Sequence, residues 1–93
     1  MEAKIIRMSA NSDEMAAIRD AIANEIRALR GRRRMSQADL IRASGVSRAA
    51  IGLIENAERD MSIPQTVKIA RALGVTPAQL LQAVQDSLEG KQL

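Results

Sequence analysis

The sequence predicts an all-α domain of five helices. Apolar residues recur at spacings of three and four in successive segments, as they do on one face of a helix. No internal repeat, low-complexity stretch or clear strand pattern interrupts these segments. A hydroxyl residue that can cap a helix precedes each of them: Ser12, Ser36, Ser47, Ser62 and Thr76. A chain of 93 residues accommodates one such domain.

The first predicted helix is the longest. Residues 1–11 lie before it, and we expect them to form an arm or a short strand. The helix begins at Ser12, and Gly31 is expected to end or loosen it. Its apolar face consists of Met15, Ile18, Ile22, Ile26 and Leu29.

The second and third predicted helices are short and are separated by one glycine. Asp39 lies three residues after Ser36, an arrangement close to a capping box. Gly45 can take a positive φ angle at no steric cost, which allows a tight turn. Ser47 then begins a helix whose core-facing residues are Ala50, Ile51 and Ile54. These features predict a helix-turn-helix, whose second helix can enter the major groove of DNA.

Two further helices complete the predicted domain. Pro64 and Pro77 stand in the first turns of these helices, where a missing N–H costs nothing, and Gly74 ends the fourth. The fifth helix carries an apolar stripe, interpreted as core against the fourth helix, with an outer half (the last two residues) available for dimerisation: Leu80, Leu81, Val84 and Leu88. The domain spans residues 12–89, and residues 90–93 form a tail.

The composition excludes several classes of function. Cysteine and histidine are both absent, which removes disulfides, thiolate metal sites and the commonest general base. We therefore expect no enzyme, no metal and no cofactor. The absence of aromatic residues argues against base stacking in single-stranded nucleic acids and favours duplex DNA. No apolar run approaches the length of a membrane span or signal peptide, so we expect a cytoplasmic, nucleoid-associated protein without a membrane partner.

The net charge of +3 is unevenly distributed. Residues 27–48 contain seven arginines and one acidic residue, a net charge of +6, whereas the rest of the chain carries −3. We call residues 27–48 the arginine block. Its position over the predicted helix-turn-helix is typical of a surface that meets phosphates, although a solvated arginine-rich turn is the alternative.

Together these motifs resemble the Xre/Cro/phage-repressor family, whose domains have a lambda repressor-like fold. The resemblance covers roughly Ile22 to Leu81. It rests on the order and spacing of Ile26-Arg27-x-Leu29-Arg30, Ser36-Gln37-x-x-Leu40, Gly45-Val46-Ser47-Arg48, Ile51, Ile54-Glu55-Asn56 and Ile69-Ala70-x-Ala72-Leu73-Gly74-Val75. It implies a compact five-helix bundle, with the helix-turn-helix at the second and third helices.

The resemblance also implies a set of DNA contacts. Gln37 would contact phosphate and brace the first base-reading side chain, which matches Arg48. Further implied contacts are Ser47, Ala49, Gly52, Leu53 and Asn56, and Asn56 is also a candidate left-handed C-cap. The arginine block adds three candidate clamps on the DNA backbone: Arg32, Arg33 and Arg34. An ion pair between Arg30 and Glu55 would join the first helix to the third.

The sequence departs from the family pattern on two helices. Ile41 follows Leu40 where the family usually has a small residue, so local packing must differ. On the third helix, Ala49 and Gly52 offer no side-chain hydrogen bond to a base edge. Arg48 can bind a guanine bidentately, which is worth about 1–3 kcal/mol of discrimination, and Ala49 can touch a thymine methyl. Gly52 costs roughly 1 kcal/mol in mid-helix and indicates close packing or close approach to DNA.

We therefore predict a sequence-specific regulator of transcription that binds duplex DNA as a homodimer and represses by excluding polymerase or another regulator. Two alternatives of the same class stay open: the antitoxin of a toxin–antitoxin pair, with a toxin as protein partner, and a restriction–modification controller. The alternative of a different class is a helical protein-interaction module that has lost DNA binding.

Overall fold

The computed structural model describes the backbone of residues 2–90 and the side chains of residues 13–90. Over this range the chain forms five α-helices and no strand, which confirms the predicted fold class. The helices are α1 (Glu2–Arg32), α2 (Gln37–Ser44), α3 (Arg48–Glu55), α4 (Ile63–Ala72) and α5 (Pro77–Gly90).

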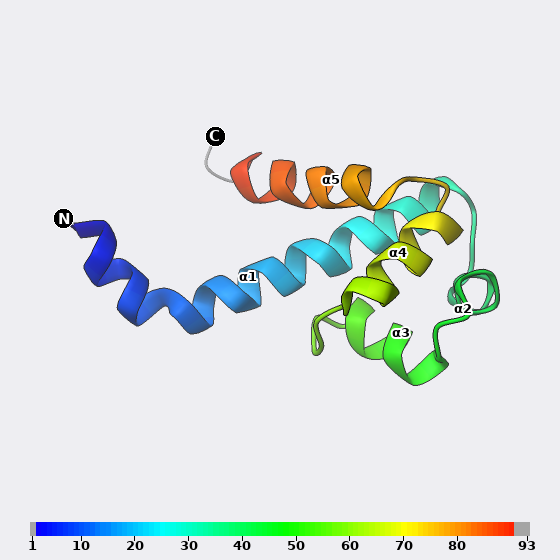
Figure 1. The fold of residues 1–93 in the computed structure, drawn as a ribbon, viewed down its shortest axis with the longest axis horizontal. Helices are drawn as coiled ribbons and strands as arrows, with labels where there is room; N and C mark the ends of the chain where they lie inside the picture. The colour runs from blue at the N-terminus through cyan, green and yellow to red at the C-terminus, as the bar shows by residue number, and fades with distance from the viewer. Residues whose placement is uncertain (1, 91–93) are drawn as a thin grey trace.

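The other four helices gather around the second half of α1 (Figure 1). α5 lies along α1 and runs in the opposite direction, so its C-terminal end comes near the middle of α1. α3 packs against α1 on the side away from α5, and α4 contacts both α2 and α5. This arrangement leaves α2 and α3 together at one side of the bundle.

The core is aliphatic and draws on every helix. Its largest fully buried side chains are Ile26, Leu40, Ile51, Ile54, Ile69, Leu73 and Leu80. Burying each of them contributes roughly 1.5–3 kcal/mol before the entropy of ordering is subtracted. The three residues of α3 predicted to face the core, Ala50, Ile51 and Ile54, are all buried.

Hydroxyl caps begin the four helices after α1, as predicted. Ser36 accepts a hydrogen bond from the backbone N–H of Asp39 (3.0 Å), and the Asp39 carboxylate accepts one from the backbone N–H of Ser36 (2.9 Å). The caps of α3, α4 and α5 are Ser47, Ser62 and Thr76. Each cap satisfies backbone donors that the helix itself leaves free, so these boundaries follow from local sequence.

The predicted start of the first helix at Ser12 is wrong. α1 begins at Glu2, and its backbone is helical through the segment expected to be an arm or a short strand. The segment from Glu2 to Arg30 contains no glycine or proline and is rich in good helix formers, so nothing in it stops the helix. The side chains of residues 1–12 lie outside the described part of the chain. Of the predicted tail, residues 90–93, Gly90 is instead the last residue of α5, and residues 91–93 lie outside the described part.

The end of α1 also differs from the prediction. Gly31 lies within the helix, and the left-handed residue of the following turn is Arg34, with φ 55°. The turn is closed when the backbone N–H of Met35 bonds to the carbonyl of Arg30 at 2.9 Å. Gly45, predicted to take a positive φ angle, has φ 73°, and Gly74, predicted to end the fourth helix, has φ 79°.

The C-terminal turn of α3 also differs from the prediction that Asn56 is left-handed. Asn56 is the C-cap, but its φ of −94° is right-handed, and the left-handed residue is Ala57 at φ 61°. Glu58 N–H bonds to the Leu53 carbonyl at 2.8 Å, and Ala57 N–H bonds to that of Ile54 at 3.1 Å. This is the Schellman pattern, which places its left-handed residue one position after the C-cap.

The apolar stripe of α5 is only partly core. Leu80 and Val84 are buried and Leu88 is half-buried, whereas Leu81 is 48% exposed. α5 packs on α1 as well as on α4, so its buried face follows the line of residues spaced by four. Leu81 lies about 100° around the helix from Leu80 and faces outward.

We expect the capping box of α2 to make the stability of the fold depend on pH. The backbone N–H and the hydroxyl of Ser36, with a smaller contribution from Arg42, lower the pKa of Asp39. The carboxylate therefore stabilises the fold fully above its unfolded pKa of about 3.9 and loses this contribution as the pH falls through the lower folded-state pKa.

Denaturant unfolding of wild type and Asp39→Asn checks this expectation. The variant should unfold more easily than wild type near neutral pH. The difference in free energy of unfolding should shrink at strongly acidic pH, where Asp39 of the wild type is protonated in both the folded and the unfolded state. A difference of constant size across this range would contradict the role of the ionised carboxylate.

Candidate nucleic-acid interface

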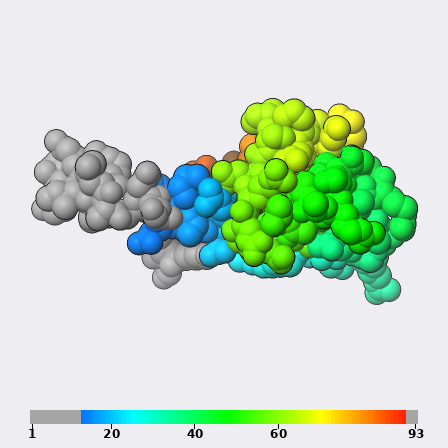
Figure 2. Space-filling model, turned by 90° about the horizontal axis from the view of Figure 1, so that it is seen from below, coloured from blue at the N-terminus to red at the C-terminus, as the bar shows by residue number. Residues whose placement is uncertain are grey.

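α3 presents one buried face and one open face. Its buried residues are Ala50, Ile51, Ile54 and Glu55. The residues predicted to meet DNA from this helix and its ends are exposed or half-buried: Ser47, Arg48, Ala49, Gly52, Leu53 and Asn56. Seen from below, the segments around α2 and α3, drawn in green, form much of the molecular face (Figure 2). The fold therefore brings the predicted residues of α3 together on one accessible surface.

The turn between α2 and α3 is held by side chains and backbone together. Gly45 caps α2, and its N–H bonds to the carbonyl of Ile41 at 3.0 Å. The buried hydroxyl of Ser44 accepts a hydrogen bond from the N–H of Val46 (3.1 Å), and Val46 is itself buried. These contacts fix the angle at which α3 leaves the turn.

The predicted ion pair between Arg30 and Glu55 is present. Nε of Arg30 lies 2.8 Å from Oε2 of Glu55, and Nη2 lies 3.0 Å from Oε1, so the pair is bidentate. The Glu55 side chain is only 4% exposed and that of Arg30 19% exposed. Nη1 of Arg30 also donates to the carbonyl of Met35 at 3.0 Å. The last residue of α3 is thereby anchored to the end of α1 and to the turn that follows it.

Two further side chains join this network, and the sequence analysis assigned neither of them to it. Nε2 of Gln37 donates to Oε1 of Glu55 at 3.2 Å. Arg27 donates through Nη1 to the backbone carbonyl of Glu55 and through Nη2 to Oδ1 of Asn24 at 2.5 Å. The spacing of three between Arg27 and Arg30, which places both on one face of α1, was the available signal. Glu55 thus joins α1, α2 and α3, and the predicted phosphate-contacting Gln37 belongs to the same network.

The three consecutive arginines after Gly31, predicted to clamp the DNA backbone, are all exposed, but they do not share one environment. The guanidinium of Arg33 lies against Gly74 in the turn between α4 and α5, where a Cβ on that glycine would lie 2.7 Å from Cζ of Arg33. Arg33 therefore packs on a turn at the start of α5 in the free protein. Arg32 and Arg34 are exposed at the end of α1, beside the start of α2.

Gly52 has no packing reason for being glycine within the described chain. A Cβ built on it would meet no atom within 4 Å. Of the two explanations that the sequence left open, close packing inside the domain is wrong. The absence of a side chain instead leaves a gap at the centre of the open face of α3, where a partner can approach the helix backbone.

Among residues whose side chains are described, no three histidine, cysteine, aspartate or glutamate residues gather closely enough to hold a metal ion. No helix in the described range is sufficiently long and apolar to cross a membrane.

Similarity to known proteins agrees with this geometry. A family model described as a helix-turn-helix domain matches residues 21–83. None of the curated proteins matches the chain. The solved structure of the restriction-modification controller protein C.AhdI from Aeromonas hydrophila is 31% identical, with a TM-score of 0.63 over 67% of this chain and 94% of that chain.

The clp gene regulator ClgR from Corynebacterium glutamicum is also similar. One of its structures is 25% identical to this chain, with a TM-score of 0.71 over 81% of this chain and 82% of that chain. Another is 24% identical, with a TM-score of 0.67 over 75% of this chain and 91% of that chain. The likeness therefore extends over most of the bundle around α2 and α3.

We expect the Glu55 network to dominate the stability of this region. Glu55→Ala removes the carboxylate and leaves the half-buried guanidinium of Arg30 without its partner, which should lower the free energy of unfolding by about 3 kcal/mol. Chemical denaturation measures the loss, and a double-mutant cycle with Arg30→Ala should give a coupling above about 1 kcal/mol.

The matched control is an exposed ion pair. Arg19 donates to Asp60 at 2.7 Å, with side chains 34% and 55% exposed, and this contact lowers the pKa of the Asp60 carboxyl. Asp60→Ala should cost far less than Glu55→Ala, because exposed pairs are screened by solvent. Equal losses in the two variants would contradict a special role for the buried network.

Proposed function

Because the chain belongs to the helix-turn-helix domain family, we propose that it is a transcriptional regulator that binds duplex DNA with α3 in the major groove. The observation that carries the proposal is the division of α3 into an anchored face and an open face. The residues toward the core are buried with Glu55, while Arg48, Gly52 and Leu53 are accessible side by side. The protein acts by binding, without catalysis.

Base contacts come from the open face of α3. Arg48 stands at the first position of the helix and is exposed, which suits a bidentate contact with guanine. Ala49 follows it and suits contact with a thymine methyl group. The missing side chain at Gly52 lets the helix backbone lie close to the groove floor, and Leu53 adds an apolar contact beside it. Such a surface reads few bases directly, so DNA shape supplies part of the specificity.

Phosphate contacts surround this helix. Gln37 opens α2, and its amide is already held by Glu55, so it presents a positioned side chain to the DNA backbone. Arg32 and Arg34 add positive charge beside it, and Asn56 lies at the far end of α3. Neutralising phosphates releases counterions from DNA, which makes binding strongly dependent on salt concentration. Arg33 would join them only if it left its place against Gly74.

The short base-reading surface favours binding as a pair. One α3 with a single arginine reader provides limited discrimination, whereas two half-sites add their discrimination energies. We therefore propose that the chain binds DNA as a homodimer and represses by occupying its site. A second candidate of the same class is control of a restriction–modification system, favoured by the likeness to C.AhdI over 94% of that chain. A neighbouring restriction or methyltransferase reading frame would distinguish it.

We expect binding to DNA from the chain's own upstream region to be tighter than binding to random duplex and to weaken steeply with salt. Arg48→Ala should weaken specific binding by roughly 5- to 150-fold, the equivalent of about 1–3 kcal/mol, and leave random-duplex binding less affected. Fluorescence anisotropy across a salt series measures both. Arg19→Ala removes the same charge from α1, outside the α2–α3 face, and serves as control.

Two outcomes would count against the proposal. Equal, weak binding to both DNAs would remove sequence-specific recognition and leave the protein-interaction module as the better explanation. An Arg48→Ala loss no larger than that of Arg19→Ala would remove α3 as the base-reading helix.

Gly52→Ala separates stability from DNA binding. Alanine favours the helix by about 1 kcal/mol over glycine, and the new Cβ meets nothing in the free protein. We therefore expect a higher melting temperature together with weaker DNA binding, because the Cβ projects from the face that approaches the groove. Thermal unfolding and anisotropy on the same preparation measure both effects. A stabilised variant with unchanged affinity would show that DNA does not approach α3 at this position.

A further inference from the structure

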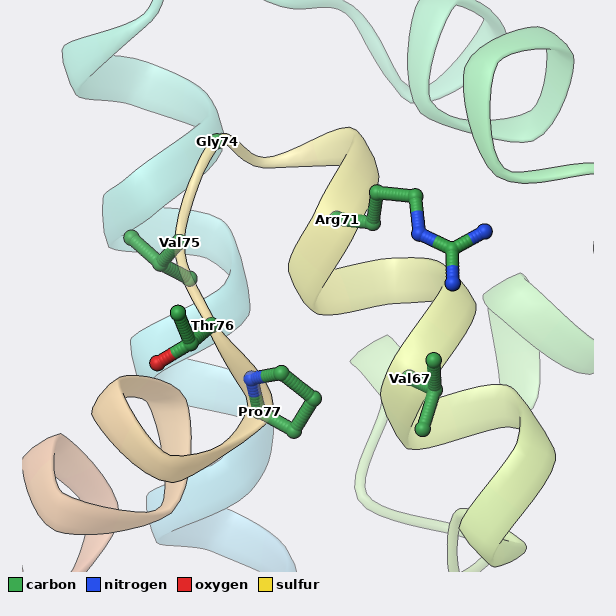
Figure 3. A pocket seen from close by; sticks show the side chains of 6 residues that line it. All are labelled: Val67, Arg71, Gly74, Val75, Thr76 and Pro77. Atoms are coloured by element: carbon green, nitrogen blue, oxygen red, sulfur yellow. The ribbon is translucent and has the colours of Figure 1, made fainter.

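The turn between α4 and α5 holds an arginine from a distant part of the chain. Arg33 directly follows α1, yet its guanidinium lies against Gly74. Figure 3 shows Gly74 where the chain leaves α4, with Arg71 one turn earlier on the helix and Val75 leading towards α5. The three atoms nearest to a Cβ built on Gly74 all belong to this guanidinium, with Cζ at 2.7 Å and Nη2 at 3.1 Å. A side chain at position 74 and the guanidinium therefore cannot occupy their places together.

The guanidinium lies at the C-terminal end of α4. The N–H of Gly74 bonds to the carbonyl of Arg71 at 3.0 Å. The N–H of Val75 bonds to the carbonyl of Ala70 at the same distance, which completes a Schellman turn. The last carbonyls of a helix carry the negative end of its dipole and lack partners within the helix, so they attract a cation. Arg33 supplies that cation to α4 from the end of another helix.

This contact is weaker than the ion pairs of the other arginines. Carboxylates pair with Arg19, Arg30 and Arg42, whereas no acidic side chain of residues 13–90 pairs with Arg33. Arg33 is also exposed, so water and salt screen its attraction to the helix end. A helix end carries about half an elementary charge, whereas a DNA phosphate carries a full one. A phosphate within reach therefore competes for this arginine.

Arg33 stands in the part of the chain that we propose to meet phosphates. Arg32 and Arg34 flank it in sequence, and both are exposed beside the start of α2. The backbone of this turn is held by the bond from the N–H of Met35 to the carbonyl of Arg30 at 2.9 Å. Arg33 can therefore reach a phosphate by rotation of its side chain, without any change in the turn.

We propose that Arg33 exchanges between two sites, the end of α4 at Gly74 in the free protein and a backbone phosphate when DNA is bound. The contact with Gly74 withholds one positive charge from DNA, so the turn between α4 and α5 limits DNA affinity although none of its residues is a proposed DNA contact. This inference rests on the proposed function for the presence of DNA beside α2. It needs phosphates but no particular base sequence, so random duplex DNA tests it independently of specific recognition.

The first experiment tests the contact without DNA. Asparagine tolerates a left-handed φ angle, so Gly74→Asn keeps the turn while its Cβ takes the place of the guanidinium. In chemical denaturation, Gly74→Asn should destabilise the wild type more than it destabilises Arg33→Ala, which has no contact left to lose. Additive effects of the two substitutions would overturn the proposal.

The matched control for this experiment is Gly45→Asn. Gly45 has a similar φ angle of 73°, and a Cβ built on it meets no atom within 4 Å. Its replacement should destabilise the wild type and Arg33→Ala equally. Circular dichroism identifies any variant that fails to fold.

The second experiment measures binding to random duplex DNA by fluorescence anisotropy across a salt series. Gly74→Asn releases Arg33 and should lower the Kd by about two- to fivefold, the range expected for a cation freed from a helix end. Arg33→Ala should reduce the slope of log binding constant against log salt concentration by about 0.9, as expected for one lost phosphate contact. Adding Gly74→Asn to Arg33→Ala should leave the affinity unchanged.

Arg32→Ala is the matched control for loss of charge. It should also reduce the salt slope, but adding Gly74→Asn to it should tighten binding as in the wild type. An unchanged Kd in Gly74→Asn, or a tightening that persists in Arg33→Ala, would overturn the exchange and leave DNA binding intact. An unchanged salt slope in Arg33→Ala would also overturn it, and this result decides the matter if Gly74→Asn fails to fold. A wild type that binds no DNA would refute the proposed function and the exchange together.

Discussion

The buried carboxylate of Glu55 connects three helices that local sequence cannot orient by itself. α2 and α3 have eight residues each, a length at which a helix is unstable alone and takes its orientation from tertiary contacts. Arg30 supplies the charge that compensates the carboxylate, Arg27 holds the backbone carbonyl of the same residue, and Gln37 brings in α2. The cost of burying a charge is offset only when all its partners are in place, so the network also selects one arrangement of the three helices.

Because α3 is anchored through one face, the residues of its other face do not pack in the core. Ala50, Ile51 and Ile54 provide the packing, and the outward positions contain residues that do little for stability. Gly52 lowers helix propensity without relieving any internal contact. A residue of low helix propensity on an accessible surface of a helix, with no packing contact that explains it, is typical of a position under functional constraint.

The uneven distribution of charge gathers exposed arginines on one side of the domain. The arginine block surrounds the start of α2 and α3, where Arg32, Arg34 and Arg48 are exposed and the nearby Glu55 is neutralised by Arg30. A surface with charge of one sign suits a polyanion, which is why we propose it as the surface that meets DNA.

The caps and turn glycines were predictable from sequence because each depends on a hydrogen bond or a φ angle within three or four residues. Ser36 and Gly45 show this: their positions set the residues at which α2 begins and ends. The resemblance also anticipated the pairing of Arg30 with Glu55. Packing alone could show that Leu81 faces outward, because which side of an apolar stripe is buried depends on helices distant in sequence. Likewise the hydrogen bond between Gln37 and Glu55 could not be predicted from sequence, because the two residues meet only when α1, α2 and α3 pack together.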